Sequence, residues 1–206
     1  CALLLAVFVL SQHVQDVLAM LGSTDDVTFD PAVFFEQDTN WRLGAAQSTG
    51  GDDLFISPSA GLMESTYGNN AVGRVLRTEV TMALRTINPA VAQDDDIYFG
   101  LLLASADDGN VTGIRINVVS DTVIDAHQVL NDRIVFANRR PSDPNLGVRL
   151  RIDRDLVTGQ IIIYVNDDPL GQPYDFFPAG TPVVPMLFVH DGGVIVGVTN
   201  WTVTLS

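Results

Sequence analysis

Hydrophobic and polar residues alternate in several segments between residue 27 and the end of the chain. In the segment 114–118, isoleucine and valine occupy the even positions, and arginine and asparagine occupy the odd ones. Successive side chains of a strand point to opposite faces, so this pattern predicts half-buried antiparallel strands. The same alternation recurs at 148–153 and 201–205, whereas more continuous apolar runs, which predict strands buried on both faces or lining the core, stand at 97–104, 161–165 and 183–189.

One segment, 75–86, fits both a helix and a strand. Leu76, Val80 and Leu84 are four residues apart, and either structure places them on one face. The density of threonine and the flanking Gly73 and Pro89 favour a strand. We therefore expect a long strand here, with these three leucine and valine side chains on its core face.

Turn-forming residues separate the predicted strands, at 108–110, 158–159, 166–169 and 191–193. About a dozen short strands, with no helical segment among them, are typical of an antiparallel sandwich. The predicted fold class is all-β: an antiparallel two-sheet jelly-roll sandwich over residues 31–206, preceded by one N-terminal hydrophobic helix.

The first 21 residues follow a different pattern. Residues 2–10 are uninterrupted apolar, and residues 11–21 are amphipathic at helical spacing up to Gly22. We expect a membrane-anchor helix over 1–21 and a short linker over 22–30. The helix is either a transmembrane helix with missing upstream residues or a lipoprotein anchor acylated at Cys1. The third interpretation is a buried helix of the globular domain or a signal remnant. The polar face of the helix would contact other membrane subunits through Gln12, His13, Gln15 and Asp16.

Composition narrows the function classes. The formal net charge is −14, from 25 carboxylates against eleven basic residues, all of them arginine. Nucleic acid is therefore excluded as a partner, because phosphate binding needs a basic face. The single cysteine excludes an intrachain disulfide framework and a thiolate zinc site.

Three segments, 97–119, 149–167 and 183–204, carry a resemblance to a known superfamily. They contain, in this order, a Gly-containing strand, a basic–apolar hairpin ending in Tyr-Val-Asn-Asp, and a late strand pair. This order resembles the concanavalin A-like lectin/glucanase superfamily, particularly laminin-G-type jelly rolls. The resemblance implies the fold and, as possible activities, sugar binding or glycoside hydrolysis. Retaining glucanases of the superfamily carry a Glu-x-Asp-x-x-Glu strand, which none of Glu36, Glu64 and Glu79 begins. We therefore expect a protein that is not an enzyme.

Candidate site residues are few. Hard oxygen ligands at a hairpin tip suit calcium, so Asp107, Asp108 and Asn110 are a candidate calcium site, with solvated turn residues as the alternative; no other cofactor is expected. Arg139 and Arg140, the one doubled cation, are candidate partner contacts. His190, or Asp125 with His127, suggests a Ser–His–Asp arrangement, but no Gly-x-Ser-x-Gly motif accompanies them. A sugar-stacking platform would draw on Trp41, Tyr67, Tyr98 and Tyr174.

The leading functional hypothesis combines these observations. We expect a membrane-anchored, non-catalytic domain on the periplasmic or cell-surface side, acting as a binding or accessory subunit of a larger membrane assembly. The alternative is a surface carbohydrate-binding, lectin-like module. A glycoside hydrolase is the weaker third hypothesis.

Overall fold

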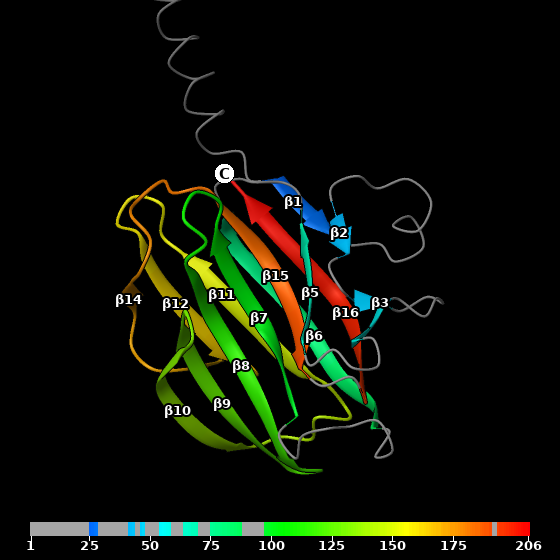
Figure 1. Cartoon of the computed structure of the whole chain (residues 1–206). Helices are drawn as coiled ribbons and strands as arrows, with labels where there is room; N and C mark the ends of the chain where they lie inside the picture. The colour runs from blue at the N-terminus through cyan, green and yellow to red at the C-terminus, as the bar shows by residue number, and fades with distance from the viewer. Residues whose placement is uncertain are drawn as a thin grey trace, which may run out of the picture.

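The computed structural model describes residues 25–28, 41–43, 46–47, 54–58, 64–69, 75–87, 97–190 and 193–206 (Figure 1). The predicted anchor helix, the linker, and the candidate residues Cys1, Gln12, His13, Gln15 and Asp16 lie outside these ranges. Among the described residues, none forms a helix with the length and apolar character that crossing a bilayer requires. Membrane anchoring therefore stays a prediction.

The described residues form two antiparallel sheets, as the alternation predicts. The nine-stranded sheet has the order β13-β12-β11-β6-β16-β4-β3, with β1 on β16 and β14 on β12; the seven-stranded sheet has the order β10-β9-β8-β7-β15-β5-β2. The strands are β1 (Asp25–Thr28), β2 (Trp41–Leu43), β3 (Ala46–Gln47), β4 (Leu54–Pro58), β5 (Glu64–Asn69), β6 (Val75–Ile87), β7 (Tyr98–Ser105), β8 (Val111–Ser120), β9 (Val123–Leu130), β10 (Arg133–Pro141), β11 (Val148–Arg154), β12 (Gln160–Val165), β13 (Asp168–Pro169), β14 (Tyr174–Asp175), β15 (Val183–His190) and β16 (Val194–Leu205).

The core lies between the sheets and is built mainly from one face of the long strands β6, β7, β8, β11, β12, β15 and β16, whereas β10 contributes no buried residue. In β8, Ile114 and Ile116 are fully buried and Val118 packs against the same core, while Arg115 and Asn117 alternate with them on the outer face. The run 161–165 alternates and lines the core on one face only. In the run 183–189 the last three residues, Leu187, Phe188 and Val189, are all buried, so this end of β15 is buried on both faces. The indole nitrogen of the buried Trp201 donates to the Thr78 hydroxyl oxygen at 3.2 Å, which satisfies a polar group that burial would otherwise penalise.

The ambiguous segment 75–86 is a strand, β6, as predicted. Val80 and Leu84 lie in the core, but the expectation for Leu76 is wrong. The register between β6 and β16 shifts at this end, so that Val75 stands opposite Leu205 and is fully buried. Leu76 is the extra residue of this irregularity, and it lines a hollow beside Arg77.

Predicted turns close the hairpins. The β12–β13 turn has Asn166 at φ 51° and Asp167 at φ 68°, the left-handed pair that a two-residue type I′ hairpin requires. Gly109 closes the β7–β8 hairpin at φ 72°. The predicted turn at 191–193 lies largely outside the described residues.

Candidate functional site

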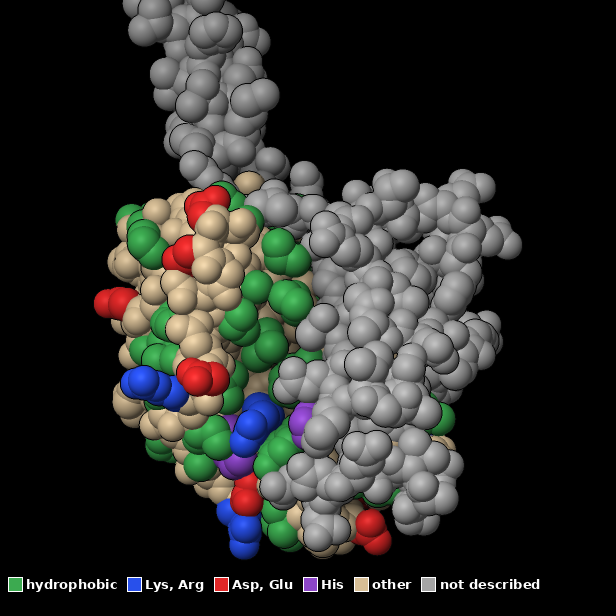
Figure 2. All heavy atoms as spheres, viewed as in Figure 1, with side chains coloured by type: hydrophobic (Ala, Val, Ile, Leu, Met, Phe, Trp, Pro, Cys, Tyr) green, Lys and Arg blue, Asp and Glu red, His purple; other side chains and the backbone are tan. Residues whose placement is uncertain are grey.

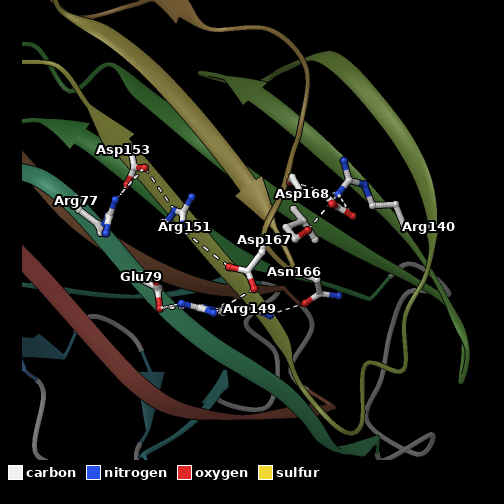
Figure 3. Close-up of polar contacts among 10 residues, drawn as sticks. Arg77, Glu79, Arg140, Arg149, Arg151, Asp153, Asn166, Asp167 and Asp168 are labelled. Atoms are coloured by element: carbon white, nitrogen blue, oxygen red, sulfur yellow. Dashed lines mark hydrogen bonds and ion pairs between the residues drawn. The ribbon is translucent and has the colours of Figure 1, made fainter.

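The outer face of each sheet, turned away from the core, presents polar side chains. On the nine-stranded sheet they form a ladder of ion pairs across β6, β11 and the β12–β13 turn (Figure 3). Arg77 pairs with Asp153 at 2.6 Å, and Arg149 pairs with Glu79 at 2.7 Å. Arg151 lies between Asp153 and Asp167, at 3.4 Å and 3.8 Å, and Asp167 also accepts from Arg149. Three arginines thus face three carboxylates, and this face neutralises its own charge.

A hollow of about 410 Å³ opens at one end of this ladder. Its lining consists of Leu76, Arg77, Asp153, Arg154, Asp155, Gln160, Ile162 and Thr204. The charged groups Arg77 and Asp153 pair with each other, and Arg154 donates to the carbonyl oxygens of Thr181 and Pro178. The charged side chains around this hollow are therefore largely satisfied within the protein.

The outer face of the seven-stranded sheet is different. The registers of β9, β8, β7 and β15 place Asp125, Asn117, Tyr98 and His190 in one row across the sheet. In the next row His127 stands opposite Arg115. Figure 2 shows the two histidines with a cationic side chain between them, below a group of hydrophobic side chains. We call Tyr98, Arg115, Asn117, His127 and His190 the central cluster.

Ring and guanidinium contacts order the central cluster. The guanidinium carbon of Arg115 lies 4.0 Å from the centre of the Tyr98 ring, within the range of a cation–π contact. The rings of Tyr98 and His190 are 5.6 Å apart, tilted by 57°. Beside them Phe188 lies over Gly100, where a Cβ would collide with the ring and with the Ile114 carbonyl oxygen. Glycine therefore lets this aromatic side chain lie close to the sheet.

Three buried polar atoms of the central cluster have no hydrogen-bond partner in the described part of the chain: Arg115 Nε, Asn117 Oδ1 and His127 Nδ1. His127 is only 9% exposed. Buried polar groups are normally satisfied, so a further hydrogen-bonding group at this sheet face would be stabilising. In the described part of the chain, Nε atoms without a hydrogen bond also occur in Arg140, Arg151 and Arg154, but each of those guanidinium groups has an ion pair or a hydrogen bond through another nitrogen.

Neighbouring charges and burial set the protonation states of two side chains of β9, Asp125 and His127. Arg139 donates two hydrogen bonds to Asp125, at 2.7 and 2.8 Å, and thereby holds the pKa of that carboxyl below its usual value. Burial, and then the charge of Arg115, lowers the pKa of His127, although Asp125 acts in the opposite direction. At neutral pH Asp125 is thus ionised, while His127 is neutral and offers one donor and one acceptor.

The hairpin tip predicted to bind calcium is held by its own side chains. The Asp108 carboxylate accepts from the backbone and the side-chain nitrogen of Asn110, and the first of these bonds lowers the Asp108 pKa most. Asn110 Oδ1 in turn accepts from Asn131 Nδ2 at 3.2 Å. Asp107 contributes only its backbone nitrogen, which donates to Ser105. Among the described residues, there is no group of three His, Cys, Asp or Glu placed to hold a metal.

The doubled cation lies on β10, and its two arginines point to different partners. Arg139 is exposed and paired with Asp125. The Arg140 side chain is 14% exposed and reaches from the seven-stranded sheet to the β12–β13 turn of the other sheet. Its nitrogens donate to the carbonyl oxygens of Val165, Asp168 and Pro169 at 3.1, 3.3 and 2.8 Å. Figure 3 shows Arg140 beside Asp168. Arg140 therefore acts as a clamp between the sheets.

The four aromatic residues considered for a stacking platform do not come together as a set. Tyr98 is in the central cluster, but Tyr174 packs against the core and shares a hydrogen bond of 2.8 Å with Thr112. Burial raises the pKa of Tyr174 to about 12. The side chains of Trp41 and Tyr67 lie outside the described part.

Similarity to solved structures identifies the fold. Peanut lectin superposes with a TM-score of 0.66 at 13% identity, covering 90% of this chain and 98% of that one. Carbohydrate-binding module CBM66 from Bacillus subtilis gives 0.54 at 15% identity, covering 82% and 96%. The fold is the concanavalin A-like jelly roll. The Bacillus licheniformis β-glucanase shares it, with a TM-score of 0.55 at 12% identity over 90% and 99% of the two chains. The sequence itself matches no family model and no curated protein.

Proposed function

We propose that this protein is a carbohydrate-binding domain whose ligand lies on the outer face of the seven-stranded sheet. The observation that carries the proposal is the central cluster with its three unpaired buried polar atoms. Sugar recognition needs rings that pack against the apolar face of a pyranose and donors and acceptors for its hydroxyls. Tyr98 and His190 supply rings, and Asn117 and neutral His127 supply both kinds of polar group. Lectins and a carbohydrate-binding module among the structural neighbours support this choice over the accessory-subunit hypothesis.

We propose binding without hydrolysis, although a glucanase and a transglycosylase are also structural neighbours. A retaining glycosidase needs two carboxyl groups about 5 Å apart. On this face Asp125 is the one carboxylate among the side chains that the structure describes, and Arg139 engages both of its oxygens. Glu64 of β5 stands opposite His190 in the register. Release of reducing sugar from a bound polysaccharide, lost in Glu64→Gln or Asp125→Asn, would contradict this part of the proposal.

Affinity electrophoresis on gels containing neutral and acidic polysaccharides tests sugar binding, because retardation measures the dissociation constant directly. We expect at least one polysaccharide to retard the wild type, and Tyr98→Ala to weaken that binding roughly tenfold, the effect of losing about 1.4 kcal/mol. The matched control is Tyr164→Ala. Tyr164 also lies under an arginine, Arg151 at 3.8 Å, but on the other sheet. An equal loss in both variants, or no retardation by any polysaccharide, would overturn the proposal.

A further inference from the structure

The stacked arginine–tyrosine unit occurs twice in the described part of this chain, once on each outer face. On the nine-stranded sheet Arg151 lies 3.8 Å above Tyr164 and has two carboxylates, Asp153 and Asp167, within 4 Å. On the seven-stranded sheet Arg115 lies 4.0 Å above Tyr98. Both units thus consist of a tyrosine ring and a guanidinium group, so they can be compared directly for the groups that neutralise the arginine charge.

In the described part of the chain, the unit on the seven-stranded sheet has no carboxylate paired with its arginine. Among the described residues, Arg115 forms no ion pair, and its Nε is buried without a partner. The other three arginines that are buried or half-buried there all have partners: Arg140 and Arg154 donate to backbone carbonyls, and Arg151 meets carboxylates. Asp125, on the neighbouring strand and the same face, is held by Arg139 through two hydrogen bonds. Arg115 therefore carries a positive charge that the described part of the protein leaves uncompensated.

We propose that the ligand of this face is an acidic saccharide, and that Arg115 binds its carboxylate or sulfate group. This inference rests on the proposed function and specifies its substrate class. A guanidinium offers a planar fork of donors that matches the two oxygens of such a group. Tyr98, lying under the guanidinium, fixes the plane of the fork. Asn117 and His127, one row and one strand away, are left to bind hydroxyls of the same or the adjoining sugar ring.

The net negative charge of the protein means that an acidic ligand would have to be bound by the local positive charge of Arg115. At a formal net charge of −14, the protein as a whole repels an acidic polymer. General attraction to a basic surface therefore cannot account for binding of a polyuronate or a sulfated glycan to this chain. Recognition has to come from a local, desolvated counter-ion, and half-buried Arg115 beside the buried His127 fits that description.

The experiment compares polymers that differ only in the acid. Polygalacturonate and its carboxyl-reduced product form one pair, and a sulfated galactan and its desulfated product form the other. Dissociation constants for the full chain are measured by affinity electrophoresis. We expect the acidic member of one pair to bind at least roughly tenfold more tightly than its neutral counterpart, as a charge-assisted hydrogen bond predicts. The pair that shows the preference distinguishes carboxylate from sulfate.

Variants at equivalent positions assign the preference to Arg115. Arg115→Gln should abolish the preference for the acidic polymer, and Arg115→Lys should retain part of it, because the charge stays but the fork is lost. Arg151→Gln, the equivalent change on the other sheet, should leave the preference intact. Equal binding of both members of each pair would overturn the acidic-ligand inference and leave sugar binding standing. Binding of no polymer would overturn both.

Discussion

The clamp formed by Arg140 predicts a difference in stability between two adjacent arginines. Arg139 and Arg140 are neighbours on β10 and of the same type, yet their side chains are 66% and 14% exposed. Arg140→Ala removes three charge-assisted hydrogen bonds between the two sheets. Arg139→Ala removes only a solvent-exposed ion pair, which contributes little because water screens it.

The size of the Arg140 effect follows from its acceptors. A hydrogen bond to a charged group contributes about 1.5–3 kcal/mol when it is protected from water. Asp168 and Pro169 are exposed, so their carbonyls regain water in the variant, whereas Val165 is buried. We therefore expect a loss of about 2–3 kcal/mol in the free energy of unfolding, close to one protected bond and well below three. With a urea dependence of about 2–3 kcal/mol per molar, the unfolding midpoint falls by about 1 M.

Urea titration followed by circular dichroism measures both midpoints. Arg140→Met serves as a second variant, because it keeps most of the aliphatic stem and so isolates the hydrogen bonds from packing. We expect Arg140→Ala and Arg140→Met to lower the midpoint alike, and Arg139→Ala to leave it near the wild-type value. A larger shift for Arg139→Ala than for Arg140→Ala would refute the clamp.

Two further predictions concern titration and calcium. Burial lowers the pKa of His127 below 6.5, so protonating this side chain costs more free energy in the folded than in the unfolded state. Stability should therefore fall as the pH drops below about 6.5. We expect His127→Gln to reduce this pH dependence in urea titrations at pH 7 and pH 5. An unchanged pH dependence would show that other groups cause it. Because Asp108 is already satisfied by Asn110, melting temperatures in EDTA and in millimolar calcium should coincide; a calcium-dependent rise that Asp108→Ala removes would instead place a cation at this hairpin tip.

Alternation predicted the strands β8, β11 and β16 and the face of each that is buried. Ile114 and Leu150 lie in the core because successive side chains of a strand point to opposite faces, and only one face of their strands is covered by the other sheet. The same rule failed at Leu76, where an extra residue in β6 shifts the register. Nothing in the local sequence marks that shift, because it depends on how β16 pairs with β6.

The central cluster was beyond local patterns for a related reason. Asp125 and His127 could be placed on one strand face from their spacing, but Tyr98 and His190 are 92 residues apart and meet only because β7 pairs with β15. Strand order depends on the packing of the whole sandwich. The separate roles of Arg139 and Arg140 also depend on it, since β10 must be an edge strand beside the β12–β13 turn before Arg140 can reach across.

The burial of Trp201 gives this protein an optical reporter of its own folding. The indole is fully buried on β16, in the nine-stranded sheet, and the chain has only one other tryptophan, Trp41. In a Trp41→Phe variant all indole emission would come from the core. It should shift to longer wavelength when water reaches Trp201 on unfolding. A saccharide on the outer face of the opposite sheet should leave the emission of the folded state unchanged, so the same fluorescence signal can follow stability while ligand is titrated.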